Sequence, residues 1–183
     1  MKNILKFIIA ILITNYSYSQ NIIPIEERKN TIVDCYNEEY YFKDINGVLN
    51  KFLGNWKFED NTQKVEISFY LRTYERGLND RFHDDEIYGK IKFTKNNVVI
   101  YDTFASNGGT YNNIKGSSFT DTNNLNKLNL YYMEPGLRGD TGRLEIEYQY
   151  NSGNPILLWH LKSHRSLTIN PFQIPYQLTL NKI

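Results

Sequence analysis

The sequence predicts an all-β protein, an antiparallel meander that closes into a small β-barrel and has a short N-terminal helix. The composition is one basis: 15 Tyr and 10 Phe occur among 183 residues, and aromatic side chains suit a pleated, half-buried surface. Short alternations of apolar and polar residues, separated by turn residues, are the other. Strands this closely spaced pair antiparallel, because parallel pairs need long crossovers.

The N-terminus has the pattern of a secretory signal peptide. Lys2 and Lys6 precede the apolar run 7–13, which is too short to span a bilayer. Small residues at the required spacing predict cleavage between Ser19 and Gln20. The open alternative is an uncleaved N-terminal anchor. A lipid anchor would need cysteine directly after the cut, where the chain has glutamine, so we expect no stable membrane anchor.

The mature chain is long enough for one domain. Removing 19 of the 183 residues leaves 164, which can bury their own core. We expect an extension at residues 20–43 and a single barrel domain at 44–183. Loss of Lys2 and Lys6 changes the net charge from +1 to −1, so no basic field favours nucleic acid. The expectation is an exported monomer, periplasmic or secreted, that binds no nucleic acid.

The stretch "KDINGVLNKFLGNWKFED", residues 43–60, changes its hydrophobic period. Asp44 can cap a helix that Gly54 would end, and Trp56 then starts an alternation of period two. The apolar face of this helix would consist of Ile45, Val48, Leu49 and Phe52. We expect the helix to plug one end of the barrel, with Trp56 deeply buried against it.

The remaining strands follow in order. Val65, Ile67, Phe69 and Leu71 share one face of a strand that is buried on one side. Further strands are predicted at residues 87–94, 97–103, 127–133, 143–150, 156–162 and 176–181. Turn residues such as Asn96-Asn97 and Pro135-Gly136 separate them.

Two resemblances attach to these segments. "FLGNWKF", Phe52 to Phe58, is similar to the Gly-x-Trp signature that opens the barrels of lipocalins and fatty-acid-binding proteins, the calycin group, with Gly54 and Trp56 as its structural residues. The fatty-acid-binding proteins' helical lid and C-terminal arginines have no counterpart here, which speaks against a fatty-acid clamp of that type. More of the chain resembles an uncharacterised family of small exported bacterial proteins, through "YSQNIIPIEE", "DINGVLNKFLGNWKF", "IYGKIKFTKNNVVIYDT" and "FQIPYQLTLNKI". That resemblance implies no activity.

One acidic segment could hold a metal ion. "NDRFHDDE" contains Asp80, His83, Asp84, Asp85 and Glu86, whose oxygen and imidazole groups are suitable ligands for a divalent cation. The segment lacks the acidic spacing of a calcium loop and falls between two predicted strands. We therefore expect a solvated hairpin loop with no metal and no catalytic duty.

Three smaller candidates also have structural explanations. His160 and His164 would lie about 13 Å apart on a strand, too far to share a zinc ion. Cys35 is the single cysteine, expected to be a buried apolar residue, with a reactive or intermolecular thiol as the alternative. Glu145 and Glu147 would face solvent from one strand rather than act as a glycosidase pair. The sequence thus predicts no catalytic residue and no cofactor.

Two functions remain open at this point. The first is an exported, non-enzymatic barrel that binds a small apolar or amphipathic ligand in its interior or at its open end. The alternative is a structural or protein-interaction module of the cell envelope whose barrel core is filled. An enzyme ranks third, because no nucleophile, base and stabiliser can be named together. The sequence does not indicate which residues would bind a ligand.

Overall fold

The computed structural model describes residues 21–33, 39–76, 82–104, 113–136, 141–151, 153–164 and 172–183. Their elements are β1 (Asn21–Pro24), η1 (Ile25–Glu27), β2 (Tyr40–Lys43), η2 (Asn50–Phe52), β3 (Gly54–Glu59), β4 (Gln63–Arg76), β5 (Phe82–Lys95), β6 (Val98–Asp102), β7 (Ile114–Asp121), β8 (Asn124–Met133), β9 (Thr141–Asn151), β10 (Asn154–Ser163) and β11 (Gln177–Lys182). The predicted cleavage site, Ser19 and Gln20, and Cys35 lie outside the described residues.

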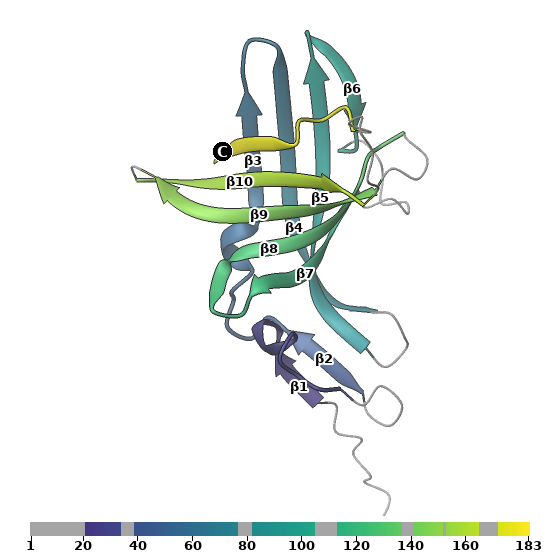
Figure 1. Ribbon diagram of the computed structural model, residues 1–183, viewed down its shortest axis with the longest axis vertical. Coiled ribbons are helices and arrows are strands. Elements are labelled where there is room, and N and C mark those ends of the chain that lie inside the picture. Colours follow the sequence, from purple (N-terminus) through teal and green to yellow (C-terminus); the bar gives the residue numbers. More distant parts are fainter. Residues whose placement is uncertain are drawn as a thin grey trace, which may run out of the picture.

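Eight strands form a closed antiparallel barrel. Their hydrogen-bonded order is β5-β4-β3-β11-β10-β9-β8-β7, and β7 pairs back onto β5. Figure 1 shows β3, β4 and β5 along the long axis of the molecule, with β8, β9 and β10 crossing them. The all-β class and the antiparallel barrel predicted from the sequence are confirmed. In the part of the chain that the structure describes, no helix is long and apolar enough to cross a membrane.

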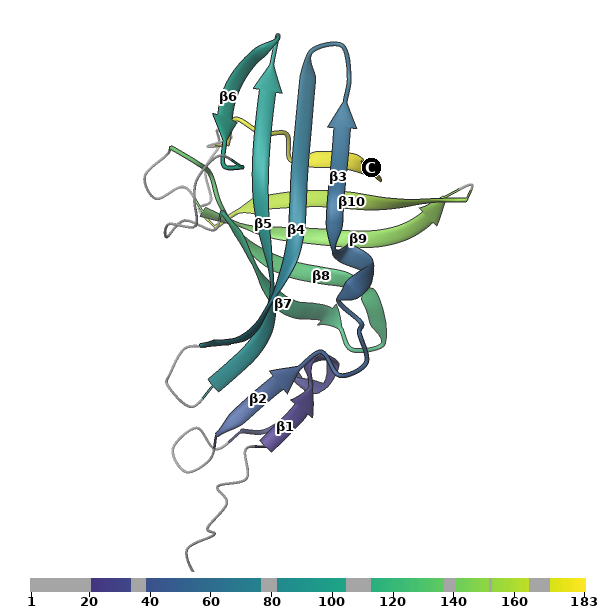
Figure 2. The ribbon, with the colours of Figure 1, turned by 180° about the vertical axis from the view of Figure 1, so that it is seen from behind.

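One edge of β5 serves three strands in succession, while β4 pairs along the other edge. β2 pairs in parallel with residues 82–84, β7 pairs antiparallel with residues 87–89, and β6 pairs antiparallel with residues 92–95. Among the described residues, the N-terminal extension, which comprises β1, η1 and β2, is therefore joined to the barrel by strand pairing only through β2 and β5. Figure 2 shows β1 and β2 at the end of the molecule opposite the β5–β6 hairpin.

Large side chains fill the barrel interior. Trp56, Trp159 and Tyr132 are each 0% exposed, and the same core cluster includes Phe52, Phe93, Ile91, Ile114, Leu144, Ile146, Leu157 and Leu180. A cavity wide enough for water would leave accessible surface on the side chains that line it. In the part of the chain that the structure describes, no such space adjoins these three fully buried side chains. The predicted burial of Trp56 is confirmed.

The predicted helix over residues 44–52 is not present. The segment forms turns that end in a single 3₁₀ turn, η2 (Asn50–Phe52). Gly47 has a φ of +64°, a left-handed conformation that breaks an α-helical run. Gly54 has a φ of +104° and starts β3 instead of capping a helix.

Part of the expected local chemistry nevertheless occurs in these turns. The Asp44 carboxylate accepts hydrogen bonds from the N–H groups of Val48 (2.7 Å) and Leu49 (3.2 Å), as a cap would. Leu49 and Phe52 are buried, but Ile45 is 55% exposed. The four apolar residues therefore do not form one helical face, and the turn buries only part of the predicted plug.

Candidate functional site at the junction of extension and barrel

The junction is built from a small parallel sheet at one end of β5. β1 pairs with β2, and β2 pairs with the first residues of β5. Residues that pair across strands share a face of the sheet. Ile22, Tyr41 and His83 form one cross-strand row, and Ile23, Phe42 and Asp84 form the row on the opposite face.

The solvated hairpin loop predicted at residues 80–86 is wrong for the residues described. Residues 82–86 belong to β5, and His83, Asp84 and Asp85 are 8%, 1% and 2% exposed. The extension covers this end of β5 and removes both carboxylates from water. Asp80 lies outside the described residues.

Asp84 is held by Arg28, which follows η1. Arg28 Nη2 lies 3.1 Å from Asp84 Oδ2, and Arg28 Nη1 donates a hydrogen bond to Ser117 Oγ of β7 at 3.2 Å. The guanidinium also lies over the Phe42 ring, 5.7 Å from its centroid. Asp84 Oδ1 is buried and has no hydrogen-bond partner among the described residues. Burial raises the pKa of Asp84 to about 6, because desolvation outweighs the attraction of Arg28.

Asp85 fastens the extension and a β-bulge to each other. Its carboxylate accepts hydrogen bonds from the Tyr41 hydroxyl (2.5 Å) and from the N–H groups of Asp44 (2.9 Å) and Tyr74 (3.2 Å). Tyr74 has a φ of +59° and lies where the register between β4 and β5 shifts. Burial and the contact with Asp85 raise the pKa of the Tyr41 hydroxyl. With donors from two segments, Asp85 has a structural role that explains its burial.

Aromatic contacts occupy His83. Its ring stacks on Tyr74 with centroids 3.8 Å apart and an interplanar angle of 6°, and Tyr41 meets Tyr74 edge-on at 5.0 Å. Successive side chains of a strand point to opposite faces, so Asp84 points away from His83 and Asp85. The described ranges contain no group of three or more side chains placed to hold one metal ion.

A pocket of about 200 Å³ opens beside Arg28, between the η1 segment and β7. Its lining consists of Ile25, Glu26, Arg28, Lys29, Ser117, Ser118 and Phe119. Ile25 and Phe119 are buried and supply an apolar wall, whereas the two cations and two hydroxyls supply donors. Lys29 Nζ donates to the Thr120 carbonyl at 3.0 Å, and Glu26 Oε1 accepts from Asn46 Nδ2 at 2.5 Å. The pocket is amphipathic and smaller than typical drug-sized sites.

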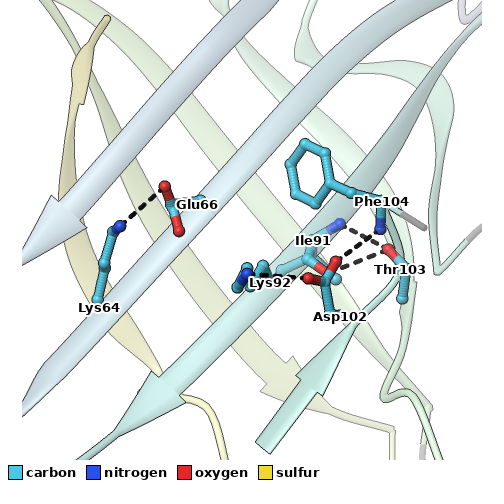
Figure 3. Close-up of polar contacts among 7 residues, drawn as sticks. All are labelled: Lys64, Glu66, Ile91, Lys92, Asp102, Thr103 and Phe104. Atoms are coloured by element: carbon cyan, nitrogen blue, oxygen red, sulfur yellow. Dashed lines mark hydrogen bonds and ion pairs between the residues drawn. The ribbon is translucent and has the colours of Figure 1, made fainter. Parts of the chain in front are cut away.

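The other sequence candidates belong to β9, to β10 or to the residue that follows β10. Glu147 forms an ion pair with Lys127 at 2.9 Å, which lowers the pKa of Glu147, and Glu145 accepts a hydrogen bond from Thr120 Oγ1 at 3.4 Å. His164 stacks on Tyr131 with centroids 6.3 Å apart, while His160 belongs to β10. Surface ion pairs also mark the outer face of β4, β5 and β6, where Lys64 meets Glu66 and Lys92 meets Asp102 (Figure 3).

The family of the chain follows from its similarity to a known family model. The model of a family of unknown function, DUF6705, matches residues 1–182. The chain belongs to this family. No curated protein and no solved structure matches the chain. Membership in DUF6705 confirms the resemblance to an uncharacterised family but assigns no activity, and the lipocalin-like strand entry stays a prediction.

Sequence reasoning missed the residues that build the pocket. Arg28 and Lys29 lie in a segment that was treated only as an extension, and Ser117 and Ser118 lie in β7, a strand that was not predicted. The adjacent cations in "EERKN" and the two-residue spacing of Ser117 and Phe119 were the available signals. Neither indicates that the two segments meet, because their contact depends on the pairing of β2 and β7 with β5.

Proposed function

We propose that this member of DUF6705 is an exported, non-enzymatic binding protein. In this proposal the barrel is a solid scaffold, and the pocket between the η1 segment and β7 binds a small amphipathic ligand. The observation that carries the proposal is the lining of that pocket, where an apolar wall of Ile25 and Phe119 faces donors from Arg28, Lys29 and Ser117. Such a mixture of apolar surface with few oriented polar groups is typical of ligand sites.

The filled core moves the proposed site from inside the barrel to its outside. An interior site would have to displace side chains such as Trp56, Trp159 and Tyr132, which are fully buried. Displacing buried aromatic side chains costs several kcal/mol each, roughly 3–5 for a complete loss. The outer pocket takes a ligand without that cost, because its volume already exists.

A protein-interaction module of the envelope is the second candidate, and a specific observation favours it. Val98 and Val99 of β6 are 61% and 50% exposed, and Phe104 just beyond β6 is 39% exposed. Among the described elements, β6 pairs with β5 alone. Exposed apolar side chains on such an edge strand are a feature of surfaces that bind another protein by strand addition. In this alternative the outer pocket has no small-molecule ligand.

Native mass spectrometry of protein purified from its own cell envelope tests the two candidates. We expect a retained small molecule on the wild-type chain and its loss from Ser118→Trp, because an indole at this exposed pocket position fills the space. Gln177→Trp, an equally bulky change at an exposed position of β11, is the matched control and should keep the molecule. Retention of a protein instead of a small molecule would favour the interaction module. Equal retention by both tryptophan variants would exclude this pocket as the ligand site.

Export is a separate part of the proposal. The expected mature N-terminus is Gln20, in the periplasm or the medium, because Ser19 ends a signal-peptide pattern. N-terminal sequencing of the protein from each cell fraction checks this. An intact Met1 terminus in the membrane fraction would instead indicate an uncleaved anchor.

A further inference from the structure

We propose that the ligand of the outer pocket carries a single negative charge, and that its binding is accompanied by uptake of one proton from solvent onto Asp84. This inference rests on the proposed function, because it names the ligand class and the regulation of the same pocket. It follows from the way in which Arg28 is shared between the pocket and a buried carboxylate.

Arg28 has the geometry of an anion-binding residue. Its guanidinium lines the pocket, and its side chain is 34% exposed. The described contacts, to Asp84 and Ser117, use two of its five N–H groups and fix its plane above the Phe42 ring. A guanidinium oriented in this way binds a carboxylate or a similar planar anion with little further loss of side-chain entropy.

The charges around the pocket set the charge of the ligand. Two cations, Arg28 and Lys29, are matched by two carboxylates, Glu26 in the lining and Asp84 behind Arg28. With both carboxylates ionised the group is neutral, and an entering monoanion would leave one excess negative charge in a partly buried place. Protonation of Asp84 makes the group +1, which a single negative charge balances. A dianion would need a second proton.

Asp84 is the carboxylate placed to take this proton. Oδ2 contacts Arg28, whereas Oδ1 is buried without a partner among the described residues and can carry the hydrogen. Burial raises the pKa of Asp84 to about 6. The ionisable groups on its own face of the sheet are Arg28 from the extension, Glu86 of β5 and Glu75, its register partner in β4, while His83 and Asp85 act on it from the opposite face of β5. β2 and β7 contribute the uncharged Phe42 and Ser117.

Isothermal titration calorimetry with three six-carbon probes tests the proposal. The probes are hexanoate, 1-hexanesulfonate, whose charge does not change with pH, and the neutral 1-hexanol. We expect both anions to bind at pH 5.5 and hexanol to bind at least tenfold more weakly. For hexanesulfonate the affinity should be about 25-fold higher at pH 5.5 than at pH 7.5, the ratio set by a pKa of about 6 when only protonated Asp84 allows binding. Titrations at pH 7.5, where Asp84 of the free protein is ionised, in two buffers of different ionisation enthalpy count the proton.

Variants test separately the proton uptake by Asp84 and the anion binding by Arg28. Asp84→Asn mimics the protonated acid, so it should bind hexanesulfonate at pH 7.5 as tightly as wild type does at pH 5.5, without pH dependence. Arg28→Gln should abolish binding. Lys29→Gln should weaken binding severalfold, because it removes an exposed charge but leaves the contact between Arg28 and Asp84 intact. Lys64→Gln removes an equal charge on the outer face of the barrel, where Lys64 pairs with Glu66, and should change nothing (Figure 3).

Three results would overturn the inference. They are equal affinity for hexanol and hexanoate, a pH dependence that Asp84→Asn retains, and no binding of either anion at pH 5.5 by a folded chain. None of these results decides the proposed function, which the mass spectrometry experiment tests separately. A retained envelope molecule that Ser118→Trp displaces would still establish the pocket as a ligand site. If Ser118→Trp retained that molecule as well as Gln177→Trp does, the proposed function itself would be refuted.

Discussion

The indole Nε1 of Trp56 donates a 2.8 Å hydrogen bond to the carbonyl oxygen of Phe52, four residues earlier in the chain. Both side chains are 0% exposed. The bond joins the 3₁₀ turn η2, which Phe52 ends, to Trp56 in β3, the first strand of the barrel. It also satisfies the only polar atom of a side chain that is otherwise suited to a dry core.

Replacing Trp56 should therefore be costly. We expect Trp56→Ala to lower the free energy of unfolding by about 3–5 kcal/mol, the range for deleting a buried large aromatic side chain. Trp56→Phe keeps most of the volume but leaves the Phe52 carbonyl unpaired, and should cost less. Urea titrations measure both variants. A loss below about 1 kcal/mol for Trp56→Ala, as surface changes give, would contradict this packing.

Stability should depend on pH through Asp84. Its pKa rises from 3.8 to about 6 in the folded protein, so the folded state binds the proton more tightly than the unfolded chain does. The free energy of unfolding should then fall as pH rises from about 4 to about 6. Asp84→Asn should remove this slope and be at least as stable as wild type at pH 7.5. Urea titrations across this pH range decide it, and an unchanged slope in the variant would assign the dependence to another group.

Asp85 should matter for the stability of the protein. Asp85→Ala leaves the Tyr41 hydroxyl and the N–H groups of Asp44 and Tyr74 without their acceptor, at a cost of about 1–3 kcal/mol or more for buried donors. Tyr41→Phe removes one of the three bonds and should cost less. Thermal melts compare both with Glu59→Ala, whose exposed pair with Lys57 should contribute little. Equal melting temperatures for Asp85→Ala and Glu59→Ala would refute this role.

Divalent metals should not change the stability of the protein. His83 and Asp85 share one face of β5 while Asp84 occupies the other, so the three side chains do not converge. We expect superimposable melts with EDTA, with excess calcium and with excess zinc. A bound ion would raise stability by about 2.7 kcal/mol at a hundredfold excess over its dissociation constant. A reproducible rise with one ion that His83→Ala abolishes would establish a metal site.

The sequence predicts the barrel strands other than β7, because their periodicity is local. Val65, Ile67 and Phe69 alternate with polar residues, and all three are buried in β4 as expected. Trp56 is likewise buried where its alternation begins. In these segments the side chains that face the core can be recognised without any knowledge of their partners.

The junction could not be predicted in this way, because its residues depend on distant partners. β2 pairs with β5 across about forty positions of sequence, as in Tyr40 with Phe82, and a strand of four residues has too few positions for a period. Two adjacent aspartates look like a loop until a covering strand and Arg28 are known. The helix failed for the opposite reason: residues 44–52 have helical spacing, but Gly47 turns the backbone.

The order of partners along β5 implies two levels of opening. β2 contacts residues 82–84, whereas β7 closes the barrel at residues 87–89, so the extension can detach while every barrel pairing remains. The amide hydrogens of β2 should then exchange with solvent through a partial opening. Those of Ile87 and Gly89 should exchange much more slowly, because their exchange requires global unfolding. Because Arg28 belongs to the part that detaches, the same excursion would take apart and rebuild one wall of the pocket without unfolding the protein.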